Sequence, residues 1–452
     1  MPTTQFCKNP AGNRRVPAGA SEATPECGQR EPSRTQSFDF NDLRSQSTLI
    51  QALVSMQTSD GMRILTFTSL FPNRTRPEFG IFVYQRVAAL ARRPGNQVQV
   101  IAPVPYFPAS LPIQKWRAFS AIPHAEMVGS LPVVHPRYPL LPEIMPLHGF
   151  LIFLGSLAEA RRLHRQEKFD CIDAHYVYPD GFAAVLLGKA LGVPVFLSAR
   201  GTDINIFPKF RLIRPMIRWA LRRAAGIVAV SAALKQIMVD LGVPPEKVEV
   251  IANGVDTNRF HAVDREKARR ELQIPIDARV VVSVGSLVAA KSHALLISAI
   301  ARLTQRNHGL RVYIVGEGPL RAKLENLVKE LHLEGQVFLP GPQPNDSLKH
   351  WFSAADISCL ASSREGMPNV VLESLSCGTP VVATRVGGVP EVLVSDDLGI
   401  LVEANAEAIA DGIDRALRRA WEPELIMSHA HSRTWDTVAE DVEAFFEKRL
   451  KL

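Results

Sequence analysis

Short apolar runs alternate with amphipathic segments along most of the chain. RILTFTS, which starts at Arg63, is followed by the helix-like YQRVAALAR from Tyr84 and then by a second apolar run, QVQVIAPV, from Gln97. The same alternation returns in FDCIDAHY, GFAAVLLGKALG and VPVFLSAR, between residues 169 and 200. Strands that are joined by helices in this way predict a parallel β-sheet.

The alternation restarts after a turn-like stretch, EKVEVIANGVDTNRF, which begins at Glu246. We therefore predict an α/β fold of two Rossmann-like domains, residues 62–245 and 246–433, whose parallel sheets face a deep cleft. The last segment, 434–452, is predicted to be an amphipathic helix that fits either domain. Its apolar stripe consists of Val438, Val442, Phe445 and Phe446.

The first 61 residues differ in composition from the rest. They are rich in Pro, Gly, Ser, Thr and charged residues and contain few large apolar side chains. Because such a segment cannot bury enough apolar surface to offset its chain entropy, we expect residues 1–61 to be a disordered extension. The pattern changes abruptly at Met62, which makes this methionine a candidate translation start.

The composition is that of a soluble globular protein in a reducing compartment. Hydrophobic residues make up 46% of the chain, and no apolar run reaches the length of about 18 residues that a membrane-spanning helix needs. The run FLIFLGSLAEA, from Phe150, meets two arginines and is expected to form a buried helix. The five cysteines lack CxxC spacing and favour a cytoplasmic protein without disulfides or a metal site. They are Cys7, Cys27, Cys171, Cys359 and Cys377.

Positive charge is concentrated in one part of the chain. Residues 62–223 contain 21 Lys and Arg against 9 Asp and Glu, a net charge of +12, whereas the whole chain carries only +7. This excess predicts an anionic partner, which is a nucleic acid, a phosphorylated substrate or a membrane surface. No recognised nucleic-acid-reading motif accompanies the charge, so we expect no nucleic-acid partner.

Two loops that follow predicted strands have the residues of a phosphate site. In VGSLVAAK, Gly285 ends a strand and Lys291 opens the next helix, where an ammonium group and free amides suit a phosphate; an exposed lysine on a loop is the alternative. In VGEGP, Gly316 and Gly318 flank Glu317 and allow backbone or ligand to approach closely. The third glycine of a dinucleotide fingerprint is missing, which argues against NAD.

The stretch SSREGMPNVVLESLSCGTP, from Ser362, contains the strongest candidate. Glu365 follows a buried strand, the residues from Gly366 to Asn369 suit a helix start, and Glu373 lies one turn into that helix. Free amides at the start of the helix would hold an anion such as a diphosphate, with the two carboxylates on sugar hydroxyls. The alternative is a helix whose acidic residues only favour its own dipole.

In this stretch the chain resembles the retaining glycosyltransferases of family 4. These enzymes are group 1 glycosyl transferases and have the GT-B fold. EGMPNVVLESLSCGTPVVAT looks like that family's E-x7-E signature. Further similar segments follow in family order and extend the resemblance over about residues 62–452. They are LFPNRTRPEFGIFVYQ, DAHYVYPDG, RGTDIN, IANGVDTNRF, VGSLVAAK and VGEGP.

The resemblance implies transfer of a sugar from a nucleotide diphosphate to an acceptor with retention of configuration and no cofactor. Lys291 matches the lysine that neutralises the diphosphate, Glu365 the glutamate near the transferred sugar, and Glu373 the ribose ligand. The predicted catalytic residues are Glu365, Lys291, His175 and, as a departure from the family pattern, Arg200. The implied donor-binding residues are Gly80, Gly285, Ser286, Lys291, Gly316, Glu317, Gly318, Glu365, Gly366, Met367, Pro368, Asn369, Val370 and Glu373. The last helix would cross back onto the first domain.

Two positions depart from the family pattern. Ser286 stands where the family usually has an arginine at the diphosphate, and Arg200 stands where it commonly has a histidine before GTD. We therefore expect Arg200 to supply the missing charge, with an ordinary ion pair as the alternative. No Asp-x-Asp occurs in the chain, so a metal-bridged diphosphate is not expected.

A basic helix is predicted near Pro215. Arg214, Arg218 and Arg222 share one face at a spacing of four residues, which suits an anionic membrane surface or, alternatively, a solvated basic face. The sequence thus predicts a cytoplasmic enzyme, peripheral on the inner face of the membrane, that acts on a glycan or lipid-linked acceptor. The alternative is a catalytically inactive protein of the same fold that regulates glycan assembly.

Overall fold

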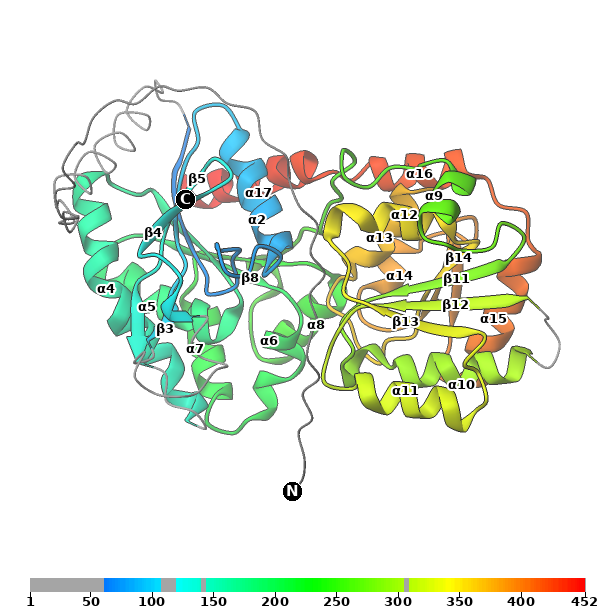
Figure 1. Ribbon diagram of the computed structural model, residues 1–452. Coiled ribbons are helices and arrows are strands. Elements are labelled where there is room, and N and C mark those ends of the chain that lie inside the picture. The colour runs from blue at the N-terminus through cyan, green and yellow to red at the C-terminus, as the bar shows by residue number, and fades with distance from the viewer. Residues whose placement is uncertain (1–60, 107–118, 140–143, 305–308, 452) are drawn as a thin grey trace, which may run out of the picture. The chain divides into compact units, whose positions relative to one another are not determined.

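The computed structural model describes residues 61–106, 119–139, 144–304 and 309–451 (Figure 1). The expected disordered extension, residues 1–61, lies outside these ranges except for Gly61. Among the described residues, no helix combines the length and the apolar character that a membrane crossing requires.

An eight-stranded sheet forms the centre of the first half of the chain. Its order is β10-β9-β8-β7-β1-β2-β5-β4, and all pairs are parallel except β4 with β5. The strands are β1 (Arg63–Phe67), β2 (Gln97–Ile101), β4 (Ala125–Val128), β5 (Leu131–Val134), β7 (Cys171–His175), β8 (Val195–Ala199), β9 (Gly226–Ala229) and β10 (Val248–Val250). A separate parallel pair is formed by β3 (Val104–Tyr106) and β6 (Arg137–Pro139).

A six-stranded, entirely parallel sheet forms the centre of the second half. Its order is β13-β12-β11-β14-β15-β16, which is the strand order of a Rossmann fold. The strands are β11 (Arg279–Val284), β12 (Leu310–Val315), β13 (Val337–Gly341), β14 (Ile357–Leu360), β15 (Val381–Thr384) and β16 (Gly399–Val402). The two parallel sheets that the alternation predicted are therefore confirmed.

Helices cover both faces of each sheet, which is why the strands read as continuous apolar runs. The helices of the first half are α2 (Ile81–Arg92), α4 (His148–Gln166), α5 (Phe182–Leu191), α6 (Thr202–Asn205), α7 (Arg214–Arg223) and α8 (Ala232–Asp240). Those of the second half are α9 (Arg265–Glu271), α10 (His293–Thr304), α11 (Arg321–Glu330), α12 (Leu348–Ala354), α13 (Asn369–Ser376), α14 (Val389–Val392), α15 (Ala406–Arg418) and α16 (Pro423–His431).

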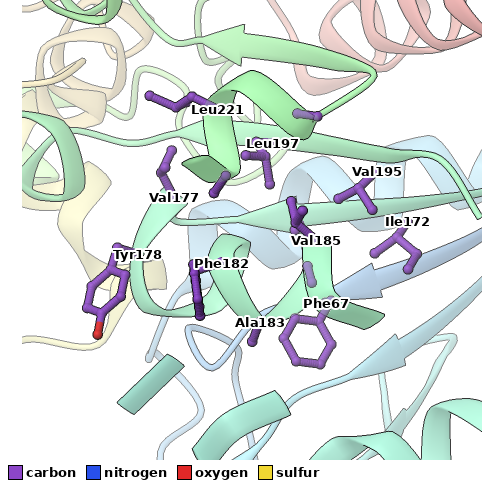
Figure 2. Close-up of a cluster of buried hydrophobic side chains, with 14 of the residues drawn as sticks. Phe67, Ile172, Val177, Tyr178, Phe182, Ala183, Val185, Val195, Leu197 and Leu221 are labelled. Carbon is purple, nitrogen blue, oxygen red and sulfur yellow. The ribbon is translucent and has the colours of Figure 1, made fainter. Parts of the chain in front are cut away.

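One face of the first sheet packs against α5 and its neighbours. Figure 2 shows Phe67, Ile172 and Leu197 from three adjacent strands facing Phe182 and Val185 of α5. All of these side chains are buried, so this cluster fixes the strand ends that precede the candidate site.

The helix that begins at His148 is only partly buried. The prediction of a buried helix is wrong for its outer face, because Phe150 is 43% exposed and Leu154 is 63% exposed. Ile152 and Ala160 face the core, so α4 is an amphipathic surface helix.

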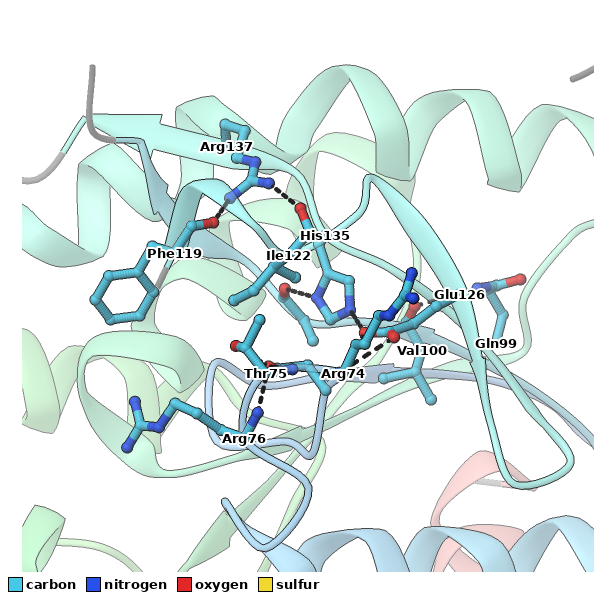
Figure 3. Close-up of polar contacts among 12 residues, drawn as sticks. Arg74, Thr75, Arg76, Gln99, Val100, Phe119, Ile122, Glu126, His135 and Arg137 are labelled. Carbon is cyan, nitrogen blue, oxygen red and sulfur yellow. Dashed lines mark hydrogen bonds and ion pairs between the residues drawn. The ribbon is translucent and has the colours of Figure 1, made fainter. Parts of the chain in front are cut away.

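The loop between β1 and α2 is fixed by polar contacts to neighbouring strands (Figure 3). The amide of Arg74 donates to Glu126 Oε2 at 3.2 Å, and Glu126 Oε1 lies 2.9 Å from His135 Nε2. His135 Nδ1 is 2.9 Å from the carbonyl of Ala102. The loop then reaches Gly80, whose φ of 70° and close approach to the carbonyl of Leu70 require glycine, since a Cβ would lie 2.4 Å from that oxygen.

The last helix, α17 (Trp435–Leu450), packs on the other face of the first sheet, beside α2. Its predicted stripe is buried, and the ring of Phe446 stacks on Phe196 of β8 with centroids 4.1 Å apart. Arg93 Nε donates to Glu443 Oε2 at 2.8 Å and adds a polar contact between α2 and α17. The end of the chain therefore completes the core of the first sheet.

We expect the substitution Phe446→Ala to lower the free energy of unfolding by about 3 kcal/mol, because it leaves a cavity against Phe196. Urea denaturation would measure the change. Lys448→Ala, on the exposed side of the same helix, is the control and should have little effect. Equal losses for the two variants would contradict the assignment of α17 to this core.

Candidate active site

Several of the predicted site residues lie near the carboxyl ends of strands at the point in each sheet where the strand order reverses. In each sheet the chain first adds strands on one side of its first strand and later adds strands on the other side. β1 therefore lies between β2 and β7, and β11 lies between β12 and β14. Ligands bind outside the carboxyl ends of strands at such switch points. His175 ends β7, Gly285 follows β11, and Glu365 lies in the loop after β14.

In the second half, the structure brings Lys291 and Glu365 into direct contact. Lys291 Nζ donates to Glu365 Oε1 at 2.7 Å, and Ser362 Oγ donates to the same oxygen at 2.6 Å. The side chains are 23% and 11% exposed, so the pair is partly shielded from water but remains open on one side. Ser362 was not predicted; its position three residues before Glu365 was the only signal.

Glu373 shares this charge environment. Burial raises the pKa of Glu373 to about 7, while the positive charges of Arg259 and Lys291 oppose that rise. Lys291 therefore acts electrostatically on both glutamates of the E-x7-E pair.

The backbone at the start of α13 approaches other parts of the chain closely. The helix begins at Asn369, and the first amides of any α-helix lack an intrahelical acceptor. A Cβ on Gly366 would lie 2.3 Å from the carbonyl of Arg200, and one on Gly387 would lie 2.0 Å from that of Glu365. Gly366 thus lets the Glu365 loop pack beside the RGTD loop, and Gly387 lets the loop after β15 pack on Glu365, so Gly366 is also required for packing.

The loops after β11 and β12 pack on each other. A Cβ on Gly316 would lie 2.0 Å from the carbonyl of Gly285, and one on Gly318 would lie 2.6 Å from that of Leu287. Glu317 Oε2 accepts from Arg321 at 3.1 Å, and the Glu317 side chain is half exposed. Backbone packing thus accounts for both glycines of VGEGP. The helix that follows this loop, α11, begins at Arg321.

His293 is a further polar residue at this site that the sequence reading missed. It opens α10, two residues after Lys291, and is buried. Burial, followed by the charge of Lys291, lowers its pKa to about 4, so the ring is neutral at physiological pH. Ser286 is exposed on the preceding loop.

In the first half, a buried ion pair lies behind His175. Arg86 of α2, 1% exposed, contacts both carboxylate oxygens of Asp173, at 3.1 and 3.2 Å, and donates to Ser198 Oγ at 2.6 Å. Asp173 Oδ2 in turn lies 3.1 Å from His175 Nε2. Neither Arg86 nor Asp173 was predicted, although a charged residue in the apolar strand CIDAH was a usable signal.

These contacts determine the tautomer of His175. Burial alone would raise the pKa of Asp173, but Arg86 and His175 outweigh it and hold the pKa well below its usual range. Burial lowers the pKa of His175 to about 3, so the ring is neutral. Its Nε2 then donates to the carboxylate, and Nδ1 accepts from Arg200 Nη2 at 2.5 Å. Both ring nitrogens are engaged, and His175 is fully buried behind Arg200.

Arg200 continues this chain of contacts to the start of α13. Arg200 Nη1 donates to Asn253 Oδ1 at 3.0 Å, and Asn253 Nδ2 donates to Asn369 Oδ1 at 2.8 Å. Burial lowers the pKa of Arg200 to about 9, so the guanidinium stays charged at neutral pH. Asp203 holds the loop by accepting from the amides of Gly201 and Val177, each at 2.8 Å.

Asp180 is a buried carboxyl group at the same edge of the first sheet. Its Oδ2 accepts from the amide and hydroxyl of Ser69, at 2.7 and 2.8 Å, whereas its buried Oδ1 has no partner among the described residues. Burial raises the pKa of Asp180 to about 7, against the lowering effect of the Ser69 contacts.

The three arginines of the predicted basic helix lie on α7, which begins at Arg214. Arg214 and Arg222 are exposed and Arg218 is half-buried, while Ile217 and Leu221 face the core. Among the described residues, no group of three or more His, Cys, Asp or Glu side chains is arranged to hold a metal ion.

Two family models together match most of the chain. The model "Glycosyltransferase Family 4" matches residues 80–259, and "Glycosyl transferases group 1" matches residues 264–430. The first match ends and the second begins between the two sheets of the structure.

Curated relatives and solved structures agree with these matches. The chain is 29% identical over 85% of its length to the teichuronic acid biosynthesis glycosyltransferase TuaC of Bacillus subtilis, covering 95% of that protein. It is 30% identical to the D-inositol 3-phosphate glycosyltransferase of Frankia alni, covering 60% of this chain and 72% of that one.

Two solved structures are similar over 86% of this chain. Sucrose-phosphate synthase from Thermosynechococcus elongatus is 19% identical, with 98% of it covered and a TM-score of 0.68. Anabaena HepE in complex with UDP-glucose is 19% identical, with 100% of it covered and a TM-score of 0.65. At these identities the structures support the fold alone.

We expect Asp173→Asn to lower the free energy of unfolding by about 3 kcal/mol or more, because Arg86 is then buried without a counter-charge. Adding Arg86→Met should recover a large part of this loss. A urea-denaturation cycle of the two single variants and the double variant measures the coupling. The exposed pair Arg92 and Asp436, treated in the same way, is the control and should show no coupling. Additive losses at Arg86 and Asp173 would contradict the buried pair.

The raised pKa of Asp180 predicts a pH dependence of stability. Between the unfolded pKa of about 4 and the folded pKa, only the folded chain holds the proton, so its stability falls as pH rises toward about 7. The side chain of the Asp180→Asn variant cannot ionise. Between about pH 5 and about pH 8 the free energy of unfolding of this variant should therefore fall by about 2 kcal/mol less than that of the natural protein. Urea denaturation at both pH values would measure this, and parallel losses would show that Asp180 is not buried in its protonated form.

Proposed function

Because the chain belongs to the group 1 glycosyl transferases of glycosyltransferase family 4, we propose that it transfers a hexose-type sugar from a nucleotide-diphosphate sugar to a glycan or lipid-linked acceptor. The transfer retains the anomeric configuration and uses no metal ion. The contact between Lys291 and Glu365, beside Glu373 and the start of α13, is the observation that carries this proposal.

The second half of the chain binds the donor in this proposal. As the bond between sugar and diphosphate breaks, negative charge accumulates on the leaving diphosphate, and fixed positive groups at that position lower the barrier. Lys291 and the amides from Gly366 to Val370 provide those groups, while Glu365 and Glu373 bind hydroxyls of the sugar and the ribose. Lys291, which donates to Glu365 in the structure, would also reach the diphosphate in this proposal.

Arg200 supplies a second cation in place of the arginine that Ser286 replaces. Its guanidinium is linked through Asn253 to Asn369, the first residue of α13. Arg86, Asp173 and His175 act through Arg200 by fixing its position, because His175 has no free nitrogen for a substrate. His175 is therefore a positioning residue in this proposal and not one that touches the sugar.

The proposal places the enzyme in the cytoplasm, at the inner face of the membrane. The exposed side chains of Arg214 and Arg222 on α7 support this location, since basic faces bind anionic lipid. The second candidate function, an inactive protein that regulates glycan assembly, is favoured only by Ser286 at the diphosphate position.

A panel of UDP-, GDP- and ADP-sugars would test the proposal. A ligand that binds only the folded protein raises its melting temperature, and an enzyme also releases the nucleoside diphosphate slowly by hydrolysis. We expect Lys291→Gln to lower kcat/KM for this release about 100-fold or more. Lys323→Gln, at an exposed lysine of α11, is the control and should leave it unchanged.

Arg200→Ala should lose nearly as much turnover as Lys291→Gln, whereas Arg161→Ala on α4 should lose none. Equal turnover for the two arginine variants would refute the charge assigned to Arg200. If the natural protein bound a nucleotide sugar but released no nucleoside diphosphate from it, the regulatory function would be favoured.

A further inference from the structure

A cavity that neither Lys291 nor Glu365 lines lies beside the Glu365 loop. It has a volume of about 860 Å³ and is lined by the segment from α6 to α7, by α8 and by Ser363 and Arg364. None of the residues assigned to the donor lines it. Arg364 immediately precedes Glu365 in the chain, so a ligand in this cavity would lie next to the proposed reaction centre.

The cavity lining is strongly cationic. Four of the lining side chains are basic and none is acidic; the basic residues are Lys209, Arg211, Arg214 and Arg364. Within the described ranges, none of the four forms an ion pair or a side-chain hydrogen bond. Four neighbouring cations without counter-charge repel one another, and a bound anion relieves that repulsion.

The lining also has an apolar component that continues onto the surface. Ile237 of α8 and Leu241, which follows that helix, line the cavity beside the cations. In the segment KFRLIR, which starts at Lys209, basic residues alternate with exposed apolar ones, since Phe210 is 45% exposed and Leu212 is 68% exposed. Exposed apolar side chains interleaved with cations suit a ligand that carries both an anionic group and a hydrocarbon chain.

We infer that this cavity binds the phosphate or diphosphate group of an amphiphilic acceptor, whose hydrocarbon chain leaves past Phe210 and Leu212. That the ligand is an acceptor rests on the proposed function. The inference narrows the class of acceptor to phosphorylated lipids. A neutral polysaccharide fits less well, because the lining has no aromatic ring on which a sugar would stack and no carboxylate to accept from hydroxyls.

The basic groups have distinct parts in this site. Arg211 and Arg214 belong to the first half of the chain and Arg364 to the loop that holds Glu365, so a phosphate between them touches both halves. The acceptor's phosphate would then fix the distance from the lipid end to the hydroxyl that attacks the donor sugar. Arg214, on the exposed basic face of α7, also lines the cavity.

Farnesyl phosphate is a suitable probe, measured by calorimetry on the full chain at low ionic strength. We expect Arg211→Glu and Arg214→Glu each to weaken its binding about tenfold or more. Arg161→Glu makes the same charge change on an exposed part of α4 and should leave binding unchanged. Arg211→Gln, which removes the charge without reversing it, should weaken binding about threefold and covers the case in which a reversal impairs folding.

Two further ligands separate the possible sources of binding. Farnesol and inorganic phosphate should each bind at least about tenfold more weakly than farnesyl phosphate, because each lacks one half of the complementary surface. Equal binding of inorganic phosphate would overturn the inference, since the cavity would then hold any small anion. If Arg211→Glu lost binding to phosphatidylglycerol vesicles but kept farnesyl phosphate, the cations would bind a bilayer surface and the inference would be wrong.

The inference and the proposed function can fail separately. Binding of a nucleotide sugar, measured in the same variants, should not change in Arg211→Glu. If farnesyl phosphate bound without regard to these residues while a nucleotide sugar was still hydrolysed, only the acceptor assignment would fall. If farnesyl phosphate bound as expected but no nucleotide sugar did, the cavity would stand and the transferase proposal would fail.

Discussion

A buried charge on α2, packed against the first sheet, organises the polar side chains around it. Arg86 is inserted among apolar side chains, and it is tolerable there only because Asp173 neutralises it and Ser198 accepts a hydrogen bond. The carboxylate that neutralises Arg86 also determines which nitrogen of His175 carries its proton. The remaining nitrogen then accepts from Arg200 and orients that guanidinium toward Asn253. One ion pair in the core thus fixes a cation at the edge of the sheet.

Much of the fold follows from the pattern of apolar residues in the sequence. Apolar runs of five or six residues that alternate with helical periodicity are sufficient to predict two parallel sheets, because both faces of each strand must be buried. The outer face of α4 was misjudged, since Phe150 and Leu154 look like core residues in a sequence and are exposed in the structure. Single apolar residues on a surface leave no signal in the periodicity.

The site was predictable to the extent that it lies on consecutive residues. Lys291 and Glu365 each lie in a recognisable segment after a strand, Glu373 lies in the helix that follows Glu365, and the structure places Lys291 against Glu365. Arg86 and Asp173 were missed because their relation depends on α2 lying across β7 and β8, and residues 87 positions apart have no common local pattern. The cationic cavity was missed for the same reason, because Arg364 is distant in sequence from Lys209 and Arg214.

The return of α17 to the first sheet has a consequence for biosynthesis. A ribosome releases the strands of the first sheet long before it reaches Trp435, yet Val442, Phe445 and Phe446 fill part of the core under those strands. The apolar face under those strands therefore stays uncovered until α17 has been synthesised, which is after every strand of the second sheet. In this protein the order of synthesis and the order of completion are thus opposite, because a helix that is translated late closes the sheet that is translated first.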